Sequence, residues 1–313
     1  MSTALWFAAM AAGTAAIVWG AERFAEHLAD ASKRLGVTAF ALAILLAGAE
    51  PEELATVVTA SARGVDGVAF GDVIGANAAI VTVALGVGAW VVTIPFGSQV
   101  RRYAIGGLAA GVLAAGLMWD GRVGRGEGLL LVTAYVGFVA AIWISERRPP
   151  VLGEAGELDE ELDEGGRVGV DLAWVLAGLA ALTAGSILLV EGVRQITAIE
   201  ESQTRLGLTV VGFATAFELV VLAWSASRHG VTEAVIAGVV GSYAYNMTMS
   251  LGAGALVAPI AISDSALLHA PLLAMLALMA IAIGLAARHD RLDRRDAVVL
   301  LAGYPAFVLI SLI

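Results

Sequence analysis

An internal repeat constrains the fold of this 313-residue chain more than any other feature. Four residues of the first half, Gly20, Glu26, Glu53 and Arg63, recur 165 residues later as Gly185, Glu191, Glu218 and Arg228. Glu53 and Glu218 both interrupt strongly apolar segments. A chain that contains one unit twice is expected to fold into two similar units that pack against each other.

Composition places both units in a membrane. Hydrophobic residues make up 59% of the chain and charged residues 15%, against about 25% charged residues in soluble domains. The 37 glycines suit helices that approach closely in lipid. The absence of cysteine excludes disulfides, thiolate catalysis and cysteine metal sites. The net charge of −10 does not suggest nucleic-acid binding, and the first apolar stretch is interpreted as a retained helix.

Apolar runs long enough to cross about 30 Å of hydrocarbon predict ten spans, five in each half. They cover residues 4–21, 37–62, 68–94, 103–119, 127–145, 171–190, 206–227, 232–262, 266–287 and 297–312. An odd number of crossings in each unit inserts the second copy upside down. The sequence therefore predicts an all-α polytopic membrane protein of ten transmembrane helices in two inverted five-helix repeats, 1–145 and 171–313.

Charge predicts the orientation of these helices. If both termini are extracellular, 13 of the 18 Lys and Arg residues fall on cytoplasmic connections and five on extracellular ones. Positive residues favour the cytoplasmic side, so we expect a multi-pass protein of the cell (inner) membrane with both termini outside. Residues 146–170 hold seven acidic residues between Glu154 and Glu164. We interpret them as an acidic cytoplasmic linker that joins the halves without fixed structure.

Acidic residues in the second predicted span are the first candidates for function. Charges near the middle of a bilayer cost several kcal/mol unless they pair or coordinate something. Glu50 and Glu53 are three residues apart and would share a helix face, whereas Glu52 would point about 100° away from Glu53. Gly48 and Pro51 would break the helix and free carbonyl oxygens to act as ligands.

The seventh span repeats this arrangement with one acid, Glu218, and one hydroxyl, Thr215, again three residues apart. The third and eighth spans should face both segments through polar or small residues, namely Ala76, Asn77, Ser242 and Asn246. Carboxylate, amide and hydroxyl oxygens suit Ca²⁺ and Na⁺ better than zinc or copper. The alternative for Glu53 and Glu218 is a structural role as buried, hydrogen-bonded acids. The four histidines and the acids Glu26 and Glu191 lie at span ends and are expected to be interfacial.

These segments resemble the paired alpha-repeats of the cation/Ca²⁺ exchanger superfamily, which includes the Na⁺/Ca²⁺ exchangers. The superfamily pattern is G-T-S-L-P-E-L in the second and seventh helices, and G-x-x-I-G-S-N with a later Asn or Asp in the third and eighth. The matching stretches here are Gly48–Leu54 and Gly71–Asn77 in the first half, and Phe213–Leu219 and Ala237–Asn246 in the second. The resemblance extends over both halves.

The resemblance implies a central Ca²⁺ site with Glu53 and Glu218 as its two essential acidic ligands. Ala49 and Ala214 stand where the superfamily uses a threonine whose backbone carbonyl also binds the ion. The other side chains implied as ligands are Glu50, Thr215, Ser242 and Asn246.

Departures from the superfamily pattern concentrate in the first repeat. Glu50 and Ala76 replace serines, and Ile80 replaces an asparagine. Losing two polar ligands should weaken the flanking sites that hold Na⁺ in Na⁺-coupled members. A third carboxylate at Glu50 brings like charges together, which favours proton uptake by one of them. A proton-coupled exchanger requires such a carboxylate, so the coupling ion stays open between Na⁺ and H⁺.

The sequence thus predicts a secondary active antiporter that exchanges Ca²⁺ or a related divalent cation for Na⁺ or H⁺ by alternating access. The alternatives are a cation channel or ion-sensing protein on the same scaffold, and an antiporter for another cation such as Mg²⁺ or Mn²⁺. We see no arrangement of residues typical of an enzyme. The expected partners are inorganic cations and the lipid bilayer, with no resident cofactor; a monomer is plausible, but the sequence leaves the oligomeric state open.

Overall fold

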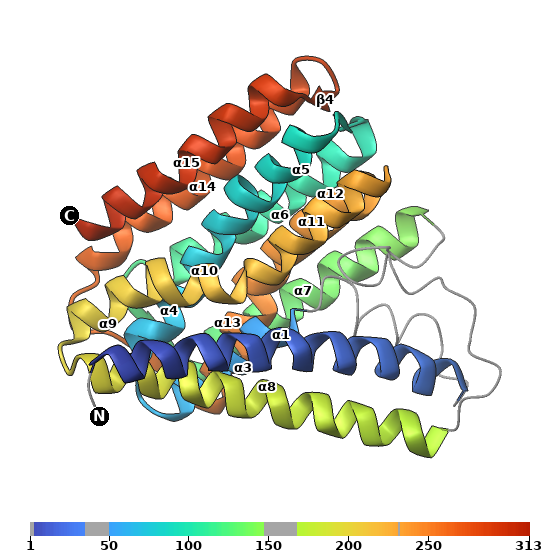
Figure 1. Ribbon diagram of the computed structural model, residues 1–313. Coiled ribbons are helices and arrows are strands. Elements are labelled where there is room, and N and C mark those ends of the chain that lie inside the picture. The colour runs from blue at the N-terminus through green and yellow to red at the C-terminus, as the bar shows by residue number, and fades with distance from the viewer. Residues whose placement is uncertain (1–2, 35–49, 147–167, 231) are drawn as a thin grey trace.

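The computed structural model describes residues 3–34, 50–146, 168–230 and 232–313, and most of them are helical (Figure 1). Two long helices, α1 (Thr3–Arg34) and α8 (Val168–Ile196), lie side by side along one edge of the molecule. The remaining helices form the larger body beside them. The predicted all-α class is confirmed, since the strands in the described part are only two residues long.

The middle of the body is one long helix built from three segments, α4 (Asp66–Ala79), the π-helical turn η1 (Ile80–Ala84) and α5 (Leu85–Val91). In the apolar stretch of this helix, 94% of the residues are buried. Protein therefore encloses the helix on nearly every side. It follows α3 (Pro51–Ala62) after a short turn at Gly64, whose φ of 65° suits glycine.

The boundaries of these segments recur in the second half. The helix α12 (Thr232–Tyr245), the π-helical turn η4 (Asn246–Ser250) and α13 (Leu251–Val257) begin and end 166 residues after α4, η1 and α5. Even the interrupted hydrogen-bond pattern of the π-helical turn is therefore repeated. The other helices are α6 (Ser98–Leu117), α7 (Arg125–Glu146), α9 (Glu200–Leu206), η3 (Gly207–Val211), α10 (Gly212–Thr215), α11 (Phe217–His229), α14 (Ala266–Ala287) and α15 (Arg294–Leu312).

Two short antiparallel sheets tie the halves together. Strand β1 (Ile94–Pro95) pairs with β4 (Arg291–Leu292), and β2 (Arg122–Val123) pairs with β3 (Ile260–Ala261). Each sheet thus takes one strand from each half of the chain. The two repeated units are interlocked at their loops rather than merely apposed.

Glycines allow α1 and α8 to pack with their backbones almost in contact. A Cβ atom added at Gly20 would lie 2.8 Å from the Gly178 carbonyl oxygen, and one added at Gly13 would lie 2.8 Å from the Gly185 carbonyl oxygen. Both clashes are with backbone atoms, which cannot move aside. Small residues at such crossings are typical of helices that associate in lipid. We therefore treat α1 and α8 as one rigid pair.

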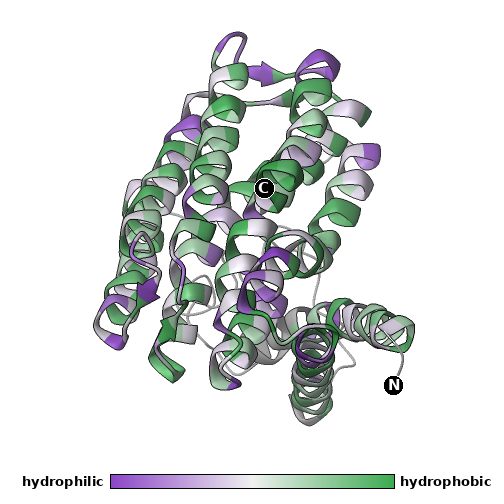
Figure 2. Cartoon of the chain, turned by 90° about the vertical axis from the view of Figure 1, so that its left-hand side faces the viewer, coloured by the Kyte–Doolittle hydropathy of each residue, from purple (hydrophilic) through white to green (hydrophobic). Residues whose placement is uncertain are grey.

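Seven helices in the described part of the chain are long and apolar enough to cross a membrane. Figure 2 shows hydrophobic residues along the helices and hydrophilic ones around the loops and strands at their ends. The structure does not establish the predicted ten spans. Half of span 37–62 lies outside the described residues, while spans 103–119 and 232–262 are largely helical but are not among the seven.

Candidate functional site

The start of helix α3 just after Glu50 shapes the acidic cluster. Helix α3 begins at Pro51, and Glu50 is its N-cap residue, with a non-helical backbone (φ −109°, ψ 80°). Proline is favoured at this first helical position because its missing N–H would have no partner there. Glu52 and Glu53 lie in the first turn, where the helix dipole favours negative charge. The start of α3 at Pro51 is consistent with the predicted effect of this proline, whereas Gly48 lies outside the described residues.

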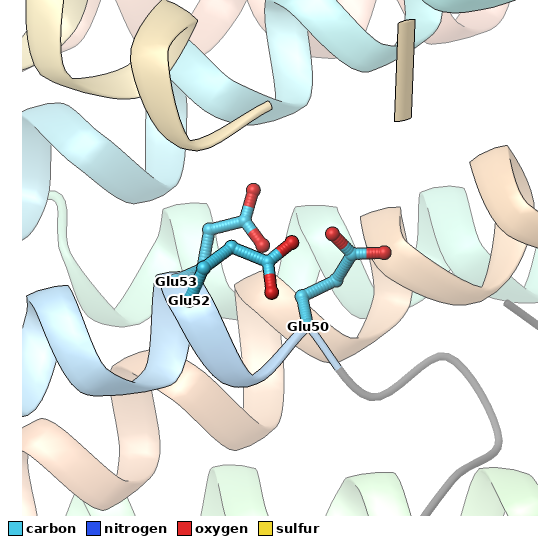
Figure 3. A group of neighbouring side chains, drawn as sticks. All are labelled: Glu50, Glu52 and Glu53. Carbon is cyan, nitrogen blue, oxygen red and sulfur yellow. The ribbon is translucent and has the colours of Figure 1, made fainter. Parts of the chain in front are cut away.

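The three glutamates form one buried group. Glu50, Glu52 and Glu53 each offer a carboxylate oxygen, and these oxygens lie within 4.8 Å of one another. Their exposed fractions are 2%, 2% and 0%. Figure 3 shows the three side chains extending to the same side of the chain. We call this group the glutamate triad.

Glu52 joins Glu50 and Glu53, whereas the spacing predicted only that its side chain leaves the helix about 100° away from that of Glu53. Glu52 and Glu53 both lie in the first turn of α3, and Glu50 precedes the helix. The non-helical backbone at Glu50 places its carboxylate beside this first turn, where it meets that of Glu52. The proline at position 51 was the available signal, because an N-terminal proline marks the start of a helix.

Polar groups from the second half complete the surroundings of the triad. The Ser242 hydroxyl on α12 donates a hydrogen bond to Glu50 Oε1. The Asn246 amide, at the start of η4, lies beside the Glu53 carboxylate. Ser242 and Asn246 are both fully buried. The structure therefore brings together four of the predicted site residues, Glu50, Glu53, Ser242 and Asn246.

A fourth buried acid, Asp72 on α4, lies near Glu53 and interacts with it electrostatically. The Thr215 hydroxyl donates to Asp72 Oδ1 at 2.9 Å, and both residues are buried. Sequence reasoning assigned no role to Asp72. An acid between Gly71 and Val73 in an otherwise apolar run was the signal that could have identified it. Thr215 thus holds this acid in the structure.

Several polar atoms of this region lack a hydrogen-bond partner among the described residues. They are Glu50 Oε2, Glu52 Oε2, both carboxylate oxygens of Glu53, Asp72 Oδ2, Asn77 Oδ1 and both amide atoms of Asn246. Buried polar atoms are almost always satisfied in folded proteins. The buried residues described include no lysine or arginine. The charge of the carboxylates must therefore be balanced by a cation or by protons.

Two tyrosines, Tyr135 on α7 and Tyr245 on α12, lie close enough to the triad to interact with it electrostatically. Tyr135 and Tyr245 are buried and meet edge to face with their ring centroids 5.2 Å apart. Leu54 and Met249 pack against them. These apolar contacts keep bulk water from the tyrosine side of the acids and so strengthen the electrostatic interactions there.

The other predicted residues lie elsewhere or outside the described part. Glu218 is half-buried in the first turn of α11, and Ala214 is half-buried on α10. Glu218 is not part of the acidic group that the described residues form. Ala49 lies outside the described residues. The histidines His27, His229 and His269 contact Asp171, the Ser225 carbonyl and the Trp119 carbonyl, away from the triad as expected.

Known proteins resemble this chain along most of its length. The family model described as "Sodium/calcium exchanger protein" matches residues 5–144 and 170–313. A protein of Alkalimonas amylolytica described as "Putative antiporter CaxA" is 25% identical over 303 residues, covering 93% of this chain and 95% of the relative. The "Inner membrane protein YrbG" of Escherichia coli K12 is 21% identical over 259 residues, covering 79% and 78%.

Solved structures of the sodium-calcium exchanger NCX_Mj have the same fold. One, from a crystal soaked with Na⁺ and Sr²⁺, superposes with a TM-score of 0.62 at 20% identity and covers 98% of this chain and 99% of that one. At this identity the likeness concerns the fold alone.

Proposed function

Since this chain belongs to the sodium/calcium exchanger family, we propose that it is a secondary active antiporter that exchanges Ca²⁺ or a related divalent cation for Na⁺ or H⁺. One observation supports this most directly. Three glutamates meet inside the protein with no basic residue among the buried residues described. Oxygen ligands of this kind suit hard cations such as Ca²⁺.

In this proposal Glu53 and Glu218 are the two acids that hold the divalent cation during transport. Glu50, Thr215, Ser242, Asn246 and the carbonyls of Ala49 and Ala214 complete its surroundings. Sodium ions or protons compete for the same carboxylates, so the two kinds of cation bind in turn. This competition makes the exchange compulsory.

The repeat supports the proposal of alternating access. We propose two inverted five-helix units, 1–145 and 171–313, in ten spans, with both termini outside and the linker 146–170 in the cytoplasm. The close packing of α1 on α8 supports their movement as one pair across the body formed by the other helices. Their displacement would open the acids first to one side of the membrane and then to the other.

We expect uptake of labelled Ca²⁺ into proteoliposomes to require an outward gradient of Na⁺ or of H⁺. The two gradients are imposed separately, with the membrane voltage clamped, so that the coupling ion is identified by which one drives uptake. Uptake that continues with neither gradient would instead indicate a cation channel. Replacing Ca²⁺ by Mg²⁺ or Mn²⁺ in the same vesicles determines which divalent cation is carried.

A further inference from the structure

The glutamate triad contains one acid more than the proposed transport site uses. Glu52 is as deeply buried as Glu50, and its Oε2 atom has no hydrogen-bond partner in the described part of the chain. An uncompensated buried carboxylate costs several kcal/mol. The charge of Glu52 therefore needs to be balanced, either by a bound cation or by a proton.

Asn246 independently indicates that a ligand belongs beside the triad. Its side chain is fully buried, and neither amide atom makes a regular hydrogen bond. The amide nevertheless lies against the Glu53 carboxylate. A side-chain amide oxygen is a common ligand of Ca²⁺. The Ser242 hydroxyl, which donates to Glu50, also keeps lone pairs available for a cation.

We propose that the triad, with Asn246 and Ser242, is a loading site that binds a divalent cation without Glu218. This inference rests on the proposed antiport function and adds a step to it. The cation first binds to Glu50, Glu52 and Glu53, and it shifts to a position between Glu53 and Glu218 when the halves close around it. Glu53 takes part in both positions.

Isothermal titration of Ca²⁺ into the purified full chain, in Na⁺-free detergent solution, tests the loading site. We expect Glu52→Gln to weaken Ca²⁺ binding at least about tenfold, the scale on which changes around a bound metal act. Glu52→Asp, which keeps the carboxylate, should recover most of the affinity. Glu218→Gln should bind Ca²⁺ nearly as the wild type does while losing flux. The control is Glu201→Gln, because the Glu201 side chain is 54% exposed and pairs with Arg205 of the same helix.

The loading site is overturned if the wild type binds no Ca²⁺ or if Glu218→Gln abolishes binding. It is also overturned if Glu52→Gln binds like Glu201→Gln. A failure of the proposed function would look different, because the wild type would then bind Ca²⁺ but show no gradient-dependent flux. Melting curves of each variant separate loss of binding from loss of folding.

A second inference comes from an ion pair between the helix pair and the body. Arg63, at the end of α3, contacts Glu191 on α8 with Nη1 and Oε2 3.4 Å apart. Their repeat equivalents are Arg228 and Glu26, which the inverted arrangement would place at the opposite face of the membrane. Glu26 instead pairs with Arg23 of its own helix at 2.7 Å, and Arg228 stacks on Trp224 of its own helix.

The two positions also differ in exposure. The Glu191 side chain is 20% exposed, whereas that of Glu26 is 54% exposed. The structure thus forms one of two equivalent contacts. Glu191 also has local partners in its own helix, with Arg194 Nε 3.6 Å away and Gln195 Nε2 donating at 2.6 Å, but it reaches Arg63 of the body in addition. We infer that the two pairs form in alternation: Arg63–Glu191 closes one face of the membrane, and Arg228–Glu26 closes the other face in the opposite state.

Crosslinking tests the alternation, and a chain without cysteine needs no background substitutions. We expect Arg63→Cys with Glu191→Cys to react with a short bifunctional thiol reagent, and the crosslink to stop flux until it is reduced. Glu26→Cys with Arg228→Cys should react only in the opposite state, and not in protein already locked through the first pair. A Glu201→Cys and Arg205→Cys pair within one helix is the control. Equal reaction of the second pair in locked protein, or no reaction of the first, would overturn the alternation.

Discussion

Glu53→Gln is expected to lower gradient-driven Ca²⁺ flux by about a hundredfold, at the upper end of the effects seen when the surroundings of a metal change. Glu53 is fully buried, belongs to the triad, and has no hydrogen-bond partner in the described part of the chain for either carboxylate oxygen. Glutamine has nearly the same shape but lacks the charge that balances a divalent cation. The measurement is uptake of labelled Ca²⁺ into proteoliposomes at matched protein density.

Thermal unfolding distinguishes this loss from misfolding. Saturating Ca²⁺ should stabilise the wild type by about 2.7 kcal/mol at a hundred times its dissociation constant, and it should stabilise Glu53→Gln far less. Without Ca²⁺ the variant should be at least as stable as the wild type, because one of several neighbouring buried acids has been neutralised. Glu201→Gln serves as the control. Normal flux through Glu53→Gln would refute the assigned ligand role.

Thr215→Val is expected to destabilise the protein by about 1–3 kcal/mol, the cost of leaving a buried polar group unsatisfied. The substitution removes the hydroxyl that donates to Asp72 Oδ1 at 2.9 Å. The other oxygen of Asp72 already lacks a partner among the described residues, so the variant would leave the carboxylate with no hydrogen-bond donor there. Flux should also fall, because the Asp72 carboxylate lies next to Glu53.

The double variant Thr215→Val with Asp72→Leu provides the decisive comparison. Removing both members of a buried polar pair can be nearly neutral, so its melting temperature should recover while its flux should not. Thr133→Val is the control, since the exposed Thr133 hydroxyl only donates to the carbonyl of Leu129 in its own helix. If the double variant were less stable than the Thr215→Val variant, the hydrogen bond would not be the source of the effect.

The sequence alone determined the membrane class, the repeat and two members of the buried acidic group, Glu50 and Glu53. In lipid the backbone N–H and C=O groups must form their hydrogen bonds within the protein, and a helix does this within one segment. The all-α class therefore follows from the apolar composition. The constant spacing between Gly20 and Gly185, or Glu53 and Glu218, identifies two copies of one unit. Motif likeness around Glu53 predicted the family to which the chain belongs.

Local backbone geometry decided the composition of the acidic group. Whether Glu52 faces Glu50 depends on where α3 begins, and a shift of one residue turns a helical side chain by about 100°. Sequence spacing placed Glu52 about 100° away from Glu53 and did not show that its carboxylate would join the other two. The proline at position 51 marks the start of the helix, but the dihedral angles of Glu50 determine where its side chain points.

Contacts between distant segments were decided by tertiary structure alone. Asp72 meets Thr215 from 143 positions away, and the strands pair across the halves. Arg63 contacts Glu191 although the repeat is equally consistent with contact between Arg228 and Glu26. A sequence with two equivalent halves specifies both sets of partners. The packing of the helix pair against the body decides which set forms, because α8 lies against α3 and so brings Glu191 to Arg63.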